Sequence, residues 1–270
     1  MPQRYEQIAQ EIEVVAAEQA EERLACLHSS EIRILLVSKY RRWEAISEAL
    51  DYFAAKNQPP PNLGENYVQG AARRAGELAL YPKAALYPKA NAPRLEMPRL
   101  EMIGPLQSNK AAQAVALFEV VHSVSSVKLL RILERAKNSP ESLEKAADKH
   151  AGGCARLPIF FQYNASGEEQ KNGCRNYDEL RILADELLAH NPSLCLQGLM
   201  CMGAAGMPNR AAFAACRELA ERLWRDFPPR QTEGRLAPYF ELSMGMSDDY
   251  RDALAEGANV LRIGSLLFAS

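Results

Sequence analysis

Several features that mark particular protein classes are missing from this sequence. No apolar run reaches about 18 residues, the length of a membrane-spanning helix, so we expect no contact with a membrane. The formal net charge is only -2, which argues against a generic nucleic-acid-binding surface. The first 27 residues carry charges throughout, unlike a signal or transit peptide. We therefore expect a cytoplasmic protein.

Cysteine and histidine motifs are missing as well. The chain has 6 cysteines, none in a C-x-x-C pair, and its 4 histidines are scattered without zinc-ligand spacing. The spacing favours free thiols in a reducing compartment over disulfides. It also predicts no metal site.

What the sequence does have is a regular alternation of apolar runs and amphipathic segments. The runs have the length of buried strands, and the segments between them have a helical period. The predicted helices include Trp43–Lys56, Val127–Lys137, Tyr177–His190, Ala211–Phe227 and Asp248–Glu256, the last with Ser247 as its N-cap, after a leading helix within residues 1–27. The predicted strands are Ile32–Lys39, Leu63–Tyr67, Leu100–Gly104, Val120–Val124, Leu157–Asn164, Leu196–Met202, Tyr239–Met244 and Asn259–Gly264.

Strands that alternate with helices form a parallel sheet. Eight of them predict a closed (β/α)8 TIM barrel, here as a single domain over residues 1–270 with an extra N-terminal helix. The alternative is a doubly wound open sheet. That fold usually has a glycine-rich first turn, whereas the first strand here ends Val37-Ser38-Lys39-Tyr40.

One segment interrupts the alternation. Between residues 79 and 102 the sequence repeats Ala-Leu-Tyr-Pro-Lys-Ala and then Pro-Arg-Leu-Glu-Met. These duplications are too short to be structural repeats, and their prolines disfavour a helix. We predict that residues 79–98 form an irregular loop excursion outside the barrel core.

Lys39 is the most informative residue because it stands where the first strand leaves the core. A partly desolvated amine at a strand end can have a lowered pKa, and a neutral amine can form a Schiff base. The alternative is that the side chain simply extends its ammonium into water.

The last two strands end in glycines and serines. Barrel enzymes commonly bind phosphate after strands 7 and 8, and here these strands end Ser243-Met244-Gly245-Met246-Ser247 and Arg262-Ile263-Gly264-Ser265. Glycine lets backbone N–H groups approach an anion, and serine adds a hydroxyl donor. Helix capping is the alternative. Arg262, two residues before Gly264, should point into the same mouth. Glycine and asparagine after the second and third strands fit turn chemistry equally well.

Taken together, these segments resemble the pyridoxal phosphate homeostasis protein family (the YggS/PROSC type), which looks like the barrel domain of alanine racemase. The matching segments run in order from about residue 32 to the C-terminus: Val37-Ser38-Lys39, Gly64-Glu65-Asn66-Tyr67-Val68-Gln69, Ile103-Gly104, Leu106-Gln107-Ser108-Asn109-Lys110, Val121-His122-Ser123-Val124, Asn164, Ser166-Gly167-Glu168-Glu169, Lys171, Gly173-Cys174, Gly198-Leu199-Met200, Ser243–Asp249 and Arg262-Ile263-Gly264-Ser265.

The resemblance implies a pyridoxal 5'-phosphate cofactor bound as a Schiff base to Lys39. It implies that Arg262 faces the pyridine nitrogen and that Asn66 and Met200 line the pocket. The phosphate would be received by Ser243, Gly245, Gly264 and Ser265. No catalytic residue is carried over.

The chain departs from the family at one place. Family members usually carry Trp-His-Phe or similar before Ile-Gly, and often His after that glycine. This chain has Glu101-Met102 before Ile103 and Pro105 after Gly104.

Three functions are compatible with these residues: a non-catalytic carrier that hands the cofactor to apo-enzymes, an amino-acid racemase-like enzyme, and a Schiff-base aldolase or phosphosugar-binding barrel. Lys39 on the first strand together with Arg262 disfavours the third. An arginine only donates hydrogen bonds, so it keeps the pyridine nitrogen unprotonated and makes the ring a poor electron sink. We expect a monomer without a second domain to supply a racemase's second base, and hence a carrier rather than an enzyme.

Overall fold

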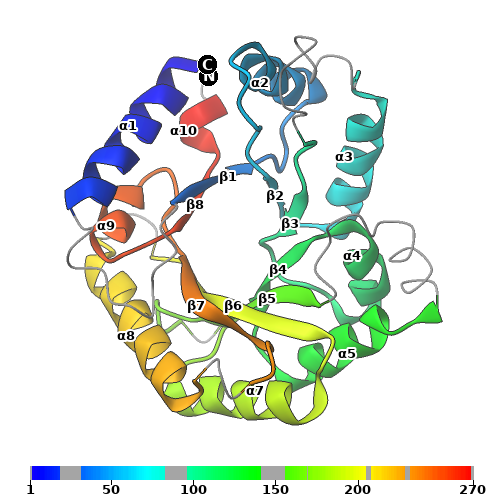
Figure 1. Cartoon of the computed structure of the whole chain (residues 1–270), viewed down its shortest axis with the longest axis vertical. Helices are drawn as coiled ribbons and strands as arrows, with labels where there is room; N and C mark the ends of the chain where they lie inside the picture. The colour runs from blue at the N-terminus through cyan, green and yellow to red at the C-terminus, as the bar shows by residue number, and fades with distance from the viewer. Residues whose placement is uncertain are drawn as a thin grey trace.

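The chain folds into a closed barrel of eight parallel strands surrounded by helices (Figure 1), as a computed structural model shows. The structure describes residues 2–18, 32–82, 96–140, 156–168, 170–204, 208–228 and 232–268. The strand order follows the chain, and β1 closes the barrel by pairing with β8. This confirms the predicted fold class. The strands are β1 (Arg33–Val37), β2 (Leu63–Glu65), β3 (Leu100–Met102), β4 (Val120–Val124), β5 (Leu157–Tyr163), β6 (Leu194–Cys201), β7 (Leu236–Ser243) and β8 (Val260–Ile263).

The helices form the outer ring in Figure 1. The predicted helices are present with small shifts of their ends. Three further helices among the described residues, α3, α4 and the short α10, are not predicted by the sequence. The helices are α1 (Pro2–Glu18), α2 (Trp43–Ala55), α3 (Val68–Leu80), α4 (Ala111–Leu117), α5 (Val127–Lys137), α7 (Tyr177–His190), α8 (Arg210–Asp226), α9 (Tyr250–Ala255) and α10 (Ser265–Phe268), with a 3-10 turn, η2 (Ser108–Lys110), before α4.

The leading helix α1 packs beside α9 and α10 in Figure 1, so the start of the chain is fixed against its end. Glu11 accepts hydrogen bonds from the Tyr250 hydroxyl at 2.5 Å and from Arg251 at 2.9 Å. The expected helix ends at Glu18 among the described residues, and the remainder of residues 1–27 lies outside them.

Side chains alternate along each strand, and this alternation divides the core in two. On β1, Ile34 and Leu36 pack in the large cluster between barrel and helices, whereas Leu35 and Val37 belong to a small cluster inside the barrel. Arg33 and Lys39 share the parity of Leu35 and Val37. Arg33 therefore begins β1 on its inward face, and Lys39 follows two residues after the strand ends at Val37.

Two sequence expectations need correction. Leu80 ends α3 and Tyr81 is buried, with its hydroxyl 2.5 Å from Asp51, so the start of segment 79–98 does belong to the core. Residues 83–95 of that segment lie outside the described residues. Ser247 does not cap the helix after β7: α9 begins later, behind Asp249, and the Ser247 hydroxyl accepts instead from the Leu266 N–H at 3.1 Å.

Candidate functional site

A cavity of about 470 Å³ opens where the first, second and last strands end at the carboxyl rim of the barrel. This volume falls in the range of small-molecule sites. Of the residues predicted from sequence, Lys39, Asn66, Arg262, Gly264 and Ser265 line it. They come from the ends of β1, β2 and β8, because parallel strands bring their carboxyl ends to one rim.

Lys39 stands between this cavity and a second one of about 420 Å³, and Tyr40 lines both. Tyr40 adopts φ +61, a left-handed conformation that is uncommon for a tyrosine. Its hydroxyl lies 3.3 Å from that of Tyr67 across the rim. Among the described residues, the Lys39 amine makes no hydrogen bond or ion pair. The amine is therefore available to a ligand.

Arg262 forms the inner end of the cavity and is only 3% exposed. Its guanidinium donates to the backbone oxygen of Ser243, to the Ser243 hydroxyl at 2.8 Å and to the Cys201 carbonyl at 2.7 Å. All three acceptors are neutral, so among the described residues no carboxylate hydrogen-bonds to this buried cation. Burial lowers the pKa of Arg262, although the nearby Cys201 and Asp249 partly offset that effect. A buried cation of this kind favours a ligand that accepts hydrogen bonds.

Gly264, Ser265 and Ser247 also line the cavity. An added Cβ at Gly264 would lie 3.0 Å from the Val37 Cβ, so the absence of a side chain there lets the β8 loop approach β1 closely. Ser265 is exposed at the mouth. The lining includes Lys39, Arg41 and Arg262 but the single acid Asp248, so positive charge dominates and suits an anion.

Three residues predicted to contact the cofactor, Met200, Ser243 and Gly245, do not line this cavity, and their contact with a ligand stays a prediction. Met200 is fully buried in the apolar cluster inside the barrel, and Met202 lines the cavity in its place. The Ser243 hydroxyl is fully buried between Arg262 and His122. Gly245, at φ +90, packs so closely on α9 that an added Cβ would lie 2.6 Å from Ala253. The sequence placed these residues near the rim but could not give their depth.

Sequence reasoning also missed part of the lining: Tyr40, Arg41, Met246 and Asp248. Each adjoins a residue or motif already singled out, so proximity in the sequence was the signal available.

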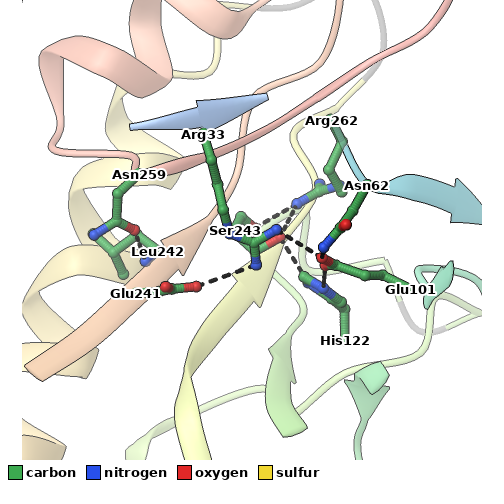
Figure 2. Close-up of polar contacts among 9 residues, drawn as sticks. All are labelled: Arg33, Asn62, Glu101, His122, Glu241, Leu242, Ser243, Asn259 and Arg262. Carbon is green, nitrogen blue, oxygen red and sulfur yellow. Dashed lines mark hydrogen bonds and ion pairs between the residues drawn. The ribbon is translucent and has the colours of Figure 1, made fainter. Parts of the chain in front are cut away.

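A larger omission lies inside the barrel. Figure 2 shows a polar network there, in which Glu101 contacts both Arg33 and His122. His122 lies in one of the segments that carry the family resemblance, but the sequence assigns it no role and no partner.

The cavity's chemistry fits pyridoxal phosphate. A free primary amine can take the aldehyde, a buried arginine donor can meet the ring nitrogen, and a glycine-serine cradle with excess positive charge can take the phosphate. The buried Arg262, whose hydrogen-bond acceptors among the described residues are all neutral, favours this ligand. When bound, the cofactor supplies a reactive aldehyde to primary amines.

Comparison with known proteins finds relatives that share one name, pyridoxal phosphate homeostasis protein. It is 33% identical over 242 residues to the pyridoxal phosphate homeostasis protein of Pseudomonas aeruginosa, covering 88% of this chain and 84% of that protein. It is 33% identical over 273 residues to the protein of that description from Vibrio cholerae, covering 97% and 95% of the two chains. These relatives are named for homeostasis rather than for a reaction, in agreement with the expectation of a non-enzyme. No protein-family model matches the chain.

Solved structures with a similar fold agree with this family assignment. PipY of Synechococcus elongatus, whose structure has pyridoxal phosphate bound, is 27% identical with a TM-score of 0.65, covering 96% of this chain and all of that one. An alanine racemase from Clostridium difficile has a TM-score of 0.59 at 9% identity, covering 91% of this chain and 53% of that one, which supports the fold alone. The resemblance drawn from sequence is thereby confirmed.

Proposed function

The chain belongs to the pyridoxal phosphate homeostasis protein family, and from this membership we propose that it binds pyridoxal 5'-phosphate through a Schiff base to Lys39. In that state it keeps the free aldehyde low and carries it to apo-enzymes. The observation that supports the proposal most is that the Lys39 amine, which has no hydrogen-bond or ion-pair partner among the described residues, lines the same cavity as the buried cation Arg262.

The remaining lining suggests a role for each residue. Gly264 and Ser265 receive the phosphate, joined by Ser247 from the β7 loop, whose hydroxyl already holds the Leu266 N–H. Arg262 donates toward the pyridine nitrogen, and Asn66 is part of the cavity lining. Met200, Ser243 and Gly245 adjoin these groups in the sequence or through hydrogen bonds, and Ser243 accepts from Arg262 at 2.8 Å.

We propose that the bound cofactor does no efficient chemistry. Arg262 leaves the ring nitrogen unprotonated, which weakens the ring as an electron sink. Racemisation also needs a second base. Tyr40 lines the cavity, but its hydrogen bond with Tyr67 raises its pKa, so at neutral pH it is a poor proton acceptor. An amino-acid racemase-like activity remains the second candidate because Tyr40 is at the rim.

The wider setting is also part of the proposal: a monomeric, single-domain, cytoplasmic carrier whose partners are the cofactor and recipient apo-enzymes, with no role for nucleic acid or membrane. Within the described residues no helix has both the length and the apolarity to cross a bilayer.

The carrier function is tested by titrating the protein with pyridoxal phosphate and following the visible absorption of the Schiff base. Lys39→Ala should lose that band, although the phosphate cradle can still hold the ligand weakly. Lys110→Ala is the matched control, since Lys110 follows β3 on the same rim but lines neither cavity. An unchanged band in Lys39→Ala would remove the basis of the proposal.

A further inference from the structure

A chain of hydrogen bonds runs through the barrel interior from the start of β1 to the cavity (Figure 2). Arg33 donates to one oxygen of Glu101 at 2.8 Å, and the His122 Nε2 lies 2.7 Å from the other oxygen. The His122 Nδ1 lies 3.0 Å from the Ser243 hydroxyl, to which Arg262 donates at 2.8 Å. Of these residues only Arg262 reaches the cavity.

The donors and acceptors along these hydrogen bonds favour one arrangement of protons. An arginine donates only and a carboxylate accepts only. The Ser243 oxygen therefore accepts from Arg262, and its own hydrogen goes to Nδ1 of His122. The proton of the imidazole must then be on Nε2, where it is donated to Glu101. If His122 were doubly protonated, the Ser243 oxygen would accept from both Nδ1 and Arg262, and the hydroxyl hydrogen would lose Nδ1 as its acceptor.

The surroundings of His122 favour the neutral ring. Burial lowers its pKa, and Arg33 and Arg262 lower it further, which together outweigh the opposing effect of Glu101. The ring is fully buried and stacks on Phe160 with 4.3 Å between ring centroids, so it has little freedom to turn. The groups that face it are thus Glu101 from β3, Arg33 from β1, Ser243 from β7, Arg262 from β8 and the ring of Phe160 from β5.

The orientation of the Arg262 side chain depends on this series of hydrogen bonds, because its acceptors come from two strands. The Cys201 carbonyl on β6 and the Ser243 backbone oxygen on β7 are fixed by the sheet. The Ser243 hydroxyl is the one acceptor that can rotate, and His122 is what holds it toward Arg262. We propose that Glu101 and His122 are positioning residues for Arg262, which they hold through Ser243 in the orientation that meets a ligand at the inner end of the cavity.

This role uses a residue that departs from the family pattern. Glu101 stands in the segment before Ile-Gly where relatives usually carry histidine. A carboxylate there offers two acceptor oxygens, one for Arg33 and Asn62 and the other for His122. A histidine could not accept from both sides at once. The hydrogen bonds from Arg33 to Arg262 are independent of any ligand. Only the expected effect on pyridoxal phosphate binding rests on the proposed function.

The matched substitutions are Glu101→Gln and Glu241→Gln. Both glutamates pair with Arg33, Glu101 at 2.8 Å and Glu241 at 3.3 Å, but only Glu101 contacts His122. A glutamine at 101 has one acceptor oxygen, so it must present an N–H either to Arg33 or to His122. The dissociation constant for pyridoxal phosphate should rise by roughly tenfold in Glu101→Gln, as for loss of a hydrogen bond to a charged group, and stay at the wild-type value in Glu241→Gln.

The first arm of the test needs no ligand. Nitrogen-15 NMR of the unloaded wild-type protein should show His122 neutral at pH 7 with its proton on Nε2, and Glu101→Gln should shift this ring signal while Glu241→Gln does not.

If Glu101→Gln fails to fold, Ser243→Ala and Ser243→Thr replace it. The affinity for pyridoxal phosphate should fall in Ser243→Ala and be restored by the hydroxyl of Ser243→Thr. A charged ring, a proton on Nδ1, or equal affinities in the two glutamate variants would overturn the proposal. Failure of the wild type to form a Schiff base would instead refute the proposed function and leave the NMR result standing.

Discussion

The buried carboxylate of Glu101 should make the protein's stability depend on pH in a way that one substitution removes. Glu101 is 1% exposed. Burial raises the pKa of this carboxyl, but Arg33 and the hydrogen bond from His122 prevail and lower it from 4.5 to about 2. Because the folded-state pKa is depressed, the carboxylate stabilises the folded protein above pH 4.5, and this stabilisation is lost as the pH falls toward 2.

The magnitude follows from the size of the shift. A difference between 4.5 and about 2, at about 1.4 kcal/mol per unit, corresponds to about 3 kcal/mol in the free energy of unfolding at pH 7. Removing one partner of a buried ion pair typically costs about 3–5 kcal/mol, in agreement with this value. At pH 3 about 2 kcal/mol of the contribution should be gone. Glu101→Gln should therefore destabilise the protein by about 3 kcal/mol at pH 7 and by only about 1 kcal/mol at pH 3.

Urea denaturation of wild type and variant at both pH values measures this difference directly, because the other carboxyls titrate in both proteins. Glu241→Gln serves as the control. Its side chain is 20% exposed and pairs with Arg33 at 3.3 Å, so its loss should cost at most about 1 kcal/mol. If the gap between wild type and Glu101→Gln is the same at pH 3 as at pH 7, the carboxylate is not held ionised by Arg33 and His122, and the reasoning fails.

Three further outcomes are expected. Ser265→Ala should weaken pyridoxal phosphate binding by about 1.5–3 kcal/mol in a spectroscopic titration, as for loss of a hydrogen bond to a charged group; wild-type affinity would place the phosphate elsewhere. Tyr81→Ala should lower the free energy of unfolding by about 3 kcal/mol because the ring is buried, whereas Tyr87→Ala, in the second copy of the duplicated segment, should stay within about 0.5 kcal/mol; equal losses would contradict the expectation that this copy is outside the core. Exchange of the Cα proton of L-alanine in deuterated buffer should be far slower than the roughly 1–10³ per second typical of enzymes, and a rate in that range would favour the racemase-like alternative.

The barrel itself could be predicted from the sequence because each strand is an apolar run with polar residues at its end. The missed helix α3 shows where this reasoning stops. Its buried face consists of Val68, Ala71, Arg74 and Leu78, and the fully buried arginine interrupts the apolar period. The guanidinium is accommodated by the Ser38 and Arg41 carbonyls, which belong to another part of the chain. Local periodicity contains no information about such partners.

The candidate site was predictable in its outline for the same reason. Lys39, Arg262, Gly264 and Ser265 follow or end strands, and parallel strands bring their ends together. How deeply each side chain lies in the barrel was not predictable. Ser243 lies only two residues before Gly245 and four before Ser247, yet its hydroxyl faces the interior network whereas Ser247 lines the cavity. Partners such as His122 and Ser243 are 121 residues apart, so no spacing in the sequence could relate them.

The measurement that tests the central claim most directly is borohydride reduction of the protein loaded with pyridoxal phosphate, followed by mass spectrometry of its peptides. The account predicts one phosphopyridoxyl group, on the peptide that contains Lys39, and no such group after reduction of Lys39→Ala. A stable adduct on another lysine of the wild type, or no adduct at all despite saturating ligand, would contradict it.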